Sequence, residues 1–169
     1  PNQHALADRY VLLDNFYCNG VNSADGHSWA TEGYVTDHLE KAFGGFTRSY
    51  TFGDDPLTYA SSGFLWDNAL RAGLTFRNYG EMDDAQLVPR GAKWQDIYND
   101  WKSRGGKIRF RQRIGIANLR QYSCPNYPGW NMRIPDVLRA DVFLRELKGF
   151  VRKNAFPNLT IIYLPSNHT

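Results

Sequence analysis

The sequence lacks any apolar run near the roughly 18 residues that a membrane-spanning helix needs, and its mean hydropathy is −0.54. A transmembrane segment is therefore excluded. An excess of charge of one sign is also missing. Twenty Lys and Arg against 17 Asp and Glu leave a net charge of +3, which by itself does not indicate a nucleic-acid binder. Ten Phe, ten Tyr and five Trp, in a chain of 169 residues that is 42% hydrophobic, exclude a disordered chain and predict one packed domain over 1–169.

Cysteine is scarce, and its pattern excludes a thiolate metal site. Cys18 and Cys124 are the only two, with no CxxC pair and no His at ligand spacing. They could form one disulfide in an oxidising compartment, but the sequence alone does not show whether they lie within bonding distance. Two unpaired, partly buried thiols are the more common arrangement.

Three well-known motifs are absent as well. The stretch 21–25 around Ser23 lacks the glycines of the GxSxG nucleophile elbow. Neither the GxxxxGK[ST] phosphate loop nor the GxGxxG fingerprint occurs. Any phosphate chemistry in this chain must therefore use other residues.

The periodicity of apolar residues predicts strands and helices in turn, which is the order of an α/β fold. We expect strands at 10–17, mostly buried, and at 74–79 and 159–164. We expect helices at 1–9, 27–43, 64–73 and 93–101 and from Pro135 onward. The segments 49–62 and 122–130 are rich in turn residues and are expected to be loops.

The segment 107–113 alternates basic and apolar residues. A basic strand face could contact phosphate groups of a nucleic acid. The more common use of such a pattern is a sheet edge whose charges prevent association. We therefore expect no nucleic acid as a partner.

Two polar segments lie where ligands gather in α/β proteins, beyond the ends of strands. Asn22 to His27 separates the first expected strand from a helix, and Ser23 there could be a nucleophile at the positive end of the helix dipole. Ser and Asp before a helix are also ordinary caps. His168 follows the last strand, where it could bind metal or phosphate or simply be a surface residue. If their strands are parallel, the two segments share one edge of the sheet.

Several short segments together resemble the phosphoesterase branch of the alkaline phosphatase superfamily, in particular bacterial alkaline-phosphatase-like proteins often fused to a β-propeller. The similarity covers nearly the whole chain. The segments that carry it are PNQHALA (1–7), LDNFY (13–17), NSADGHSW (22–29), FLWDNAL (64–70), RNYGE (77–81) and IYLPSNHT (162–169).

This resemblance implies a mostly parallel sheet flanked by helices and hydrolysis of phosphate esters with divalent metal ions such as zinc. It implies that Ser23 is the nucleophile and a metal ligand, that Asn22 and His27 bind substrate, and that His168 binds metal. Related branches have a phosphate-binding Asn where this chain has Gly26. The resemblance also implies a periplasmic or extracellular location and an attached β-propeller.

Family members carry further metal ligands before the segment that matches Pro1 and after the segment that matches Thr169. We therefore expect the chain to be the central part of a larger phosphoesterase domain, with an incomplete fold, and to bind metal poorly and hydrolyse little on its own. The alternative is a non-catalytic domain that keeps the fold and binds a glycan or a surface polymer. Gly26 and the aromatic segments around Trp66 and Trp130 favour that alternative.

Overall fold

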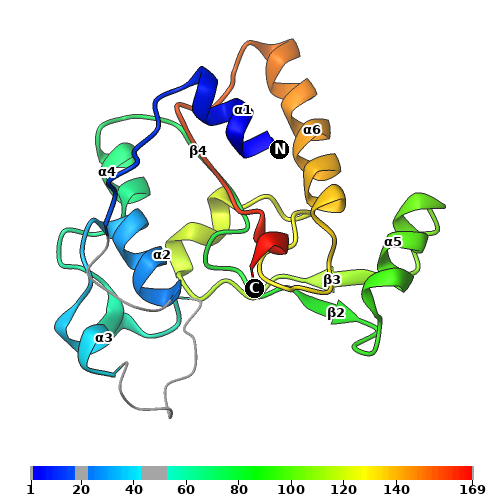
Figure 1. Ribbon diagram of the computed structural model, residues 1–169, viewed down its shortest axis with the longest axis horizontal. Helices are drawn as coiled ribbons and strands as arrows, with labels where there is room; N and C mark the ends of the chain where they lie inside the picture. The colour runs from blue at the N-terminus through cyan, green and yellow to red at the C-terminus, as the bar shows by residue number, and fades with distance from the viewer. Residues whose placement is uncertain (1, 18–22, 43–52, 169) are drawn as a thin grey trace.

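The computed structural model describes residues 2–17, 23–42 and 53–168. These residues form α-helices, short 3₁₀ helices (η) and strands, arranged as Figure 1 shows. The α-helices are α1 (Asn2–Arg9), α2 (Ser23–Glu32), α3 (Asp37–Ala42), α4 (Leu65–Arg71), α5 (Trp94–Lys102) and α6 (Asp136–Lys153). The strands are β1 (Phe76–Tyr79), β2 (Gln86–Val88), β3 (Arg109–Arg111) and β4 (Leu159–Ile162), and the 3₁₀ helices are η1 (Pro56–Thr58), η2 (Ala117–Tyr122) and η3 (Pro165–Asn167).

The strands of the described chain form two short pairs. β1 and β4 are parallel, with Phe76 opposite Leu159 and Tyr79 opposite Ile162. β2 and β3 are antiparallel. The α/β class is therefore confirmed, and the parallel pair joins two segments that the sequence predicted as strands. In Figure 1, α5 and the β2–β3 pair lie on one side of the molecule and α2, α3 and α4 on the other.

Helix α6 shows why the helices with the strongest sequence signals were predicted correctly. Pro135 precedes it, Asp136 lies in its first turn, and Arg152 and Lys153 lie in its last turn, as the helix dipole favours. Asn154 ends it in the left-handed conformation, with φ of 49°. Helices α1, α4 and α5 also lie within a residue or two of their predicted ranges.

None of the helices in the described ranges combines the length and the apolar character needed to cross a membrane.

The prediction of a buried strand at 10–17 is wrong. This segment forms no strand, and its apolar side chains are exposed, Val11 to 90%. Asp14 and Asn15 form a turn in the middle of the segment. An apolar run becomes a strand only where a neighbouring strand supplies hydrogen bonds and cover, and both described strand pairs form without it.

The predicted helix at 27–43 is two helices. α2 begins four residues earlier, at Ser23, and ends before Gly33, whose φ is 66°. That left-handed conformation is accessible to glycine and stops the helix. α3 begins after Thr36, whose hydroxyl accepts a hydrogen bond from the Leu39 N–H at 3.2 Å.

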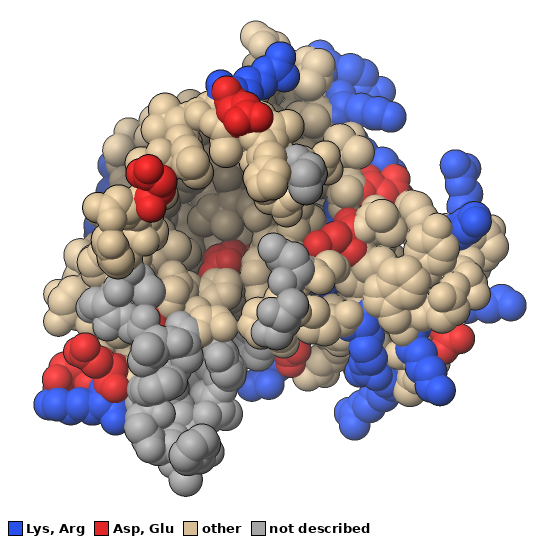
Figure 2. Space-filling view, in the orientation of Figure 1, with Lys and Arg blue, Asp and Glu red and all other residues tan. Residues whose placement is uncertain are grey.

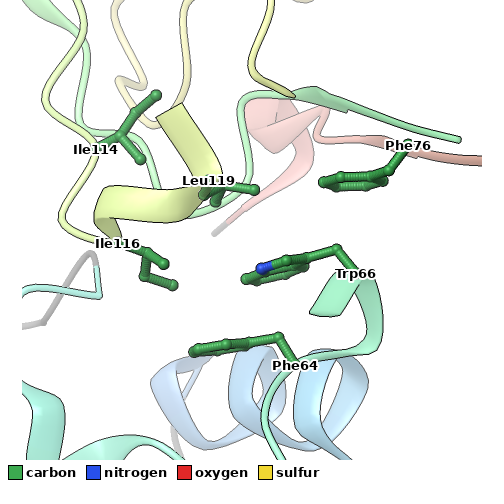
Figure 3. Packing of buried hydrophobic residues seen from close by; sticks show 6 residues of the cluster. All are labelled: Phe64, Trp66, Phe76, Ile114, Ile116 and Leu119. Carbon is green, nitrogen blue, oxygen red and sulfur yellow. The ribbon is translucent and has the colours of Figure 1, made fainter. Parts of the chain in front are cut away.

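The main core joins α4, β1 and η2 (Figure 3). The indole of Trp66 is fully buried and stacks on the ring of Phe64, with centroids 4.4 Å apart and an interplanar angle of 7°. Phe76 of β1 lies on the other side, 5.9 Å from Trp66. Trp66 is therefore a core residue and does not contribute to a ligand surface.

A second cluster surrounds Tyr79 at the end of β1 and includes Cys124, which is buried. Cys18 lies outside the described residues.

Candidate functional site

The structure brings Ser23 and His168 together although they are 145 residues apart in the sequence. Ser23 Oγ lies 3.3 Å from His168 Nε2. Ser23 is the first residue of α2, and His168 follows η3, beyond the end of β4. The η3 turn is fixed to α6 because the Ser166 N–H donates a hydrogen bond to Asp136 Oδ2 at 3.0 Å. The contact places a hydroxyl next to an imidazole at the N-terminus of a helix.

A second imidazole, that of His27, belongs to the same helix and pairs with a buried carboxylate. His27 Nδ1 lies 2.6 Å from Glu81 Oε1, and the Glu81 side chain is only 6% exposed. Burial is the strongest influence on the pKa of His27 and lowers it. The hydrogen bond to Glu81 and the negative charge of that carboxylate together outweigh burial, so the pKa of His27 is raised above its ordinary value. Because Nδ1 is occupied by Glu81, Nε2 is the ring nitrogen left for a ligand.

Two hydrogen bonds to Asn78 position Glu81 just beyond the end of β1. The side-chain oxygen of Asn78 accepts a hydrogen bond from the Glu81 N–H at 3.1 Å, and the Asn78 amide donates to the Glu81 carbonyl at 3.0 Å. Gly80 makes this turn with φ of 92°. A Cβ there would lie 3.0 Å from the Tyr127 ring and 3.1 Å from Gly129 Cα, so glycine is required.

Ser23, His27 and His168 line a cavity of about 270 Å³. The other residues that line it are Ala24, Leu39, Met82, Asp83, Asp84, Trp130 and Tyr163. Each imidazole packs against an aromatic ring of the cavity. Trp130 meets His168 edge to face at 4.8 Å, and Tyr163 meets His27 edge to face at 5.3 Å. On the face shown in Figure 2, Lys and Arg side chains gather at the periphery, whereas the central hollow shows an acidic side chain among uncharged ones.

Asp83 connects the cavity to the segment that carries Trp130. Its carboxylate accepts hydrogen bonds from the N–H groups of Arg113 at 2.7 Å and Gly129 at 3.0 Å. Burial raises the pKa of Asp83 to about 6, against the opposing effect of these two backbone donors. The Asp83 carbonyl also accepts a hydrogen bond from the Trp130 N–H at 2.6 Å. Asp83 therefore fixes the position of the Trp130 backbone.

A metal ion needs more donors than this arrangement supplies. Ser23 Oγ and His168 Nε2 are both metal-binding atoms, but a pair of donors does not make a metal centre. Across residues 2–17, 23–42 and 53–168 there is no group of three or more His, Cys, Asp or Glu placed to hold a metal. The donor set of the described residues does not fit a complete divalent metal site.

The structure brings only some of the predicted site residues together. Ser23, His27 and His168 lie around one cavity, and Asn22 lies outside the described residues. Gly26 lies inside α2, with no atom within 4 Å of a Cβ built on it. Sequence reasoning missed Glu81 and the Asp83–Asp84 pair. The available signal was their position shortly after the predicted strand 74–79, where ligand-binding residues gather.

Comparisons with protein-family models, with curated proteins and with solved structures found no match to this chain. The geometry of the site therefore carries the functional argument.

Proposed function

We propose that this site hydrolyses phosphate esters through Ser23 as the nucleophile. The observation that carries the proposal is the contact of 3.3 Å between Ser23 Oγ and His168 Nε2. A serine hydroxyl is a weak nucleophile until a base takes its proton. An imidazole nitrogen within hydrogen-bond reach of that hydroxyl is such a base.

The reaction we propose has two steps. In the first, His168 Nε2 accepts the proton of Ser23 while Oγ attacks phosphorus, and the bond from phosphorus to the leaving oxygen breaks. His27, whose Nδ1 is bound by Glu81, acts as an imidazolium and donates its Nε2 proton to that oxygen. In the second step water attacks the phosphoserine and gives a proton to the now neutral His27. The bond from phosphorus to Ser23 Oγ breaks, and His168 returns to Oγ the proton that it accepted in the first step. Ser23 begins α2, so the first-turn N–H groups and the helix dipole favour the charge on the phosphoryl oxygens.

The divalent metal stays a prediction from the resemblance. If a metal is bound, it would polarise the phosphoryl oxygens, and the described donors it could use are Ser23 and His168. The donor set of the described residues is incomplete for a metal, so we assign no step to one.

Labelling with an alkyl fluorophosphonate tests the nucleophile directly. The hydroxyl oxygen of an activated serine attacks the phosphorus of this reagent, displaces fluoride and becomes covalently labelled. Peptide mass spectrometry then identifies the labelled serine. We expect the label on Ser23, no label there in Ser23→Ala, and labelling slowed by about a hundredfold in His168→Asn, as loss of a general base predicts. The matched control is Ser166→Ala, which removes an exposed neighbouring serine and leaves Ser23 reactive.

Each labelling reaction is run with EDTA and with added zinc, alongside hydrolysis of p-nitrophenyl phosphate. Labelling that zinc accelerates and EDTA suppresses supports metal assistance. Labelling spread evenly over surface serines, or unchanged in His168→Asn, overturns the proposal that Ser23 is an activated nucleophile.

One observation favours a second candidate, a non-catalytic domain that binds a glycan or a surface polymer. The Trp130 ring lines the cavity, and aromatic faces bind sugar rings through apolar contact. This candidate predicts a Trp130-dependent glycan affinity together with an unreactive Ser23. The labelling experiment separates the two functions.

A further inference from the structure

We propose that the ester bound at this site carries a flat, uncharged aromatic group, which lies against Trp130 beside the reacting phosphorus. This inference rests on the proposed function, because it assumes that the phosphoryl group sits next to Ser23 Oγ in the cavity, between the two histidines. It adds the chemical class of the remainder of the substrate and names Trp130 as the residue that determines specificity.

The aromatic rings of the cavity are next to the reacting groups. Trp130 touches the His168 ring, with centroids 4.8 Å apart and an interplanar angle of 77°. Tyr163 touches the His27 ring and lies nearly parallel to Trp130, at 6.3 Å and 20°. A group attached to a phosphorus atom between the two histidines would therefore meet aromatic surface first. Aromatic rings bind one another by offset stacking or edge contact, beyond the effect of buried area.

The rest of the lining is apolar or negatively charged. Leu39 is 1% exposed and Ala24 is buried, while Met82 is half-buried. Asp83 and Asp84 also belong to the lining, whereas none of the Lys and Arg residues in the described part of the chain does. A second phosphate or a carboxylate on the substrate would find no cationic side chain in this lining to pair with. A neutral ring needs no such partner.

The volume suits this occupant. A cavity of about 150 Å³ lined by apolar side chains binds benzene, and this one measures about 270 Å³. The difference leaves room for a phosphoryl group beside the ring. The position of Trp130 is also fixed in advance, because its N–H donates to the Asp83 carbonyl at 2.6 Å and its carbonyl accepts from the Ala85 N–H at 3.0 Å.

Three stable phosphonate esters of equal charge test the proposal by isothermal titration calorimetry. They are the monomethyl esters of phenylphosphonic, cyclohexylphosphonic and methylphosphonic acid. We expect the phenyl compound to bind about tenfold more tightly than the methyl compound, with the cyclohexyl compound in between. In Trp130→Leu the phenyl advantage should fall to about twofold or less, while affinity for the methyl compound stays unchanged.

Two control variants make the result specific. Trp94→Leu changes a 44% exposed tryptophan on α5 that does not line the cavity, and it should keep the phenyl preference. Trp130→Phe keeps a ring and should keep part of the preference, which covers the case in which the leucine variant folds poorly. Equal affinity for the three compounds, or equal loss for all three in Trp130→Leu, overturns the proposal.

Failure of this inference is distinguishable from failure of the proposed function. Ser23 labelling without a phenyl preference refutes the substrate class alone. A Trp130-dependent phenyl preference with an unreactive Ser23 refutes phosphate ester hydrolysis and leaves an aryl-binding pocket.

Discussion

Replacing Arg139 with methionine removes a guanidinium that is fully buried at the start of α6. Its N–H groups donate to the carbonyls of Pro128, Gly129, Asn131 and Ile134 and to the carboxylate of Asp136. The contact with Gly129 measures 2.6 Å and that with Pro128 measures 3.0 Å. These bonds fix the segment 128–134, which includes Trp130, against α6. Arg139 therefore supports one wall of the cavity without lining it.

The magnitude of the effect follows from these contacts. Methionine has an unbranched side chain but no donor, so four carbonyl groups and Asp136 lose their shared partner. Removing one partner of a buried, hydrogen-bonded charge costs about 3–5 kcal/mol. Arg139→Lys keeps the charge, but an ammonium group cannot reach all five acceptors, and we expect a loss of about 1–3 kcal/mol.

Urea unfolding at pH 7, followed by circular dichroism and by tryptophan fluorescence, measures these losses as changes in the free energy of unfolding. Arg145→Met is the matched control. Arg145 lies on the same helix, is 67% exposed at its side chain and pairs with Asp141 at 3.4 Å, an interaction that contributes less than about 0.5 kcal/mol. If Arg139→Met and Arg145→Met lower the free energy of unfolding equally, the buried network of Arg139 does not hold the segment 128–134 in place.

Three further predictions use the same measurements. Trp66→Ala should lower the free energy of unfolding by about 3–5 kcal/mol because it empties a fully buried position; a loss below about 1 kcal/mol would contradict the aromatic core. Gly129→Ala should destabilise by about 1–3 kcal/mol, since a Cβ would lie 2.2 Å from the Asp83 carbonyl oxygen. Gly149→Ala, with open space around it in α6, should instead stabilise by up to about 1 kcal/mol, and equal effects of the two would refute the close approach. The pKa of His27 is raised in the folded protein, so its pairing with Glu81 stabilises the fold fully below the ordinary histidine pKa and progressively less as pH rises through the raised value. His27→Gln should therefore cost more stability at pH 5.5 than at pH 8.5, and a pH-independent cost would show that the pair carries no charge.

Local patterns were enough to predict the elements whose ends carry their own signals. α6 has a proline before it and a left-handed residue after it, and α5 begins with the Lys93 N–H bonded to Asp96 Oδ2 at 3.0 Å. These interactions lie within a few residues of one another, so they are visible in a single sequence. The segment 10–17 has no such signal. Its apolar run resembled a strand, but strand formation depends on a partner that local pattern does not specify.

Local sequence signals also predicted part of the candidate site. Ser23 and His168 were found because each is a chemically active residue next to the end of an element. Glu81 was missed because a single glutamate after a strand is common, and its role depends on its contact with His27. Trp130 was noticed as one aromatic among several, whereas Trp66, named beside it, lies in the core. Burial of this kind is decided by packing between distant segments, which composition does not reveal.

The candidate site lies beyond the carboxyl ends of the two parallel strands β1 and β4. β1 takes the place that the sequence had predicted for a strand at residues 10–17. β1 and β4 run in parallel, and the Tyr163 N–H continues the ladder by donating to the Tyr79 carbonyl at 2.9 Å. The chain therefore leaves both strands at the same end, toward Glu81 in one case and toward His168 in the other. α2 meets that end through two contacts, His27 with Glu81 and Ser23 with His168. One contact therefore joins α2 to the segment after β1, and the other joins α2 to the segment after β4. Ser23 and His168 can meet only because both segments leave the parallel pair at the same end.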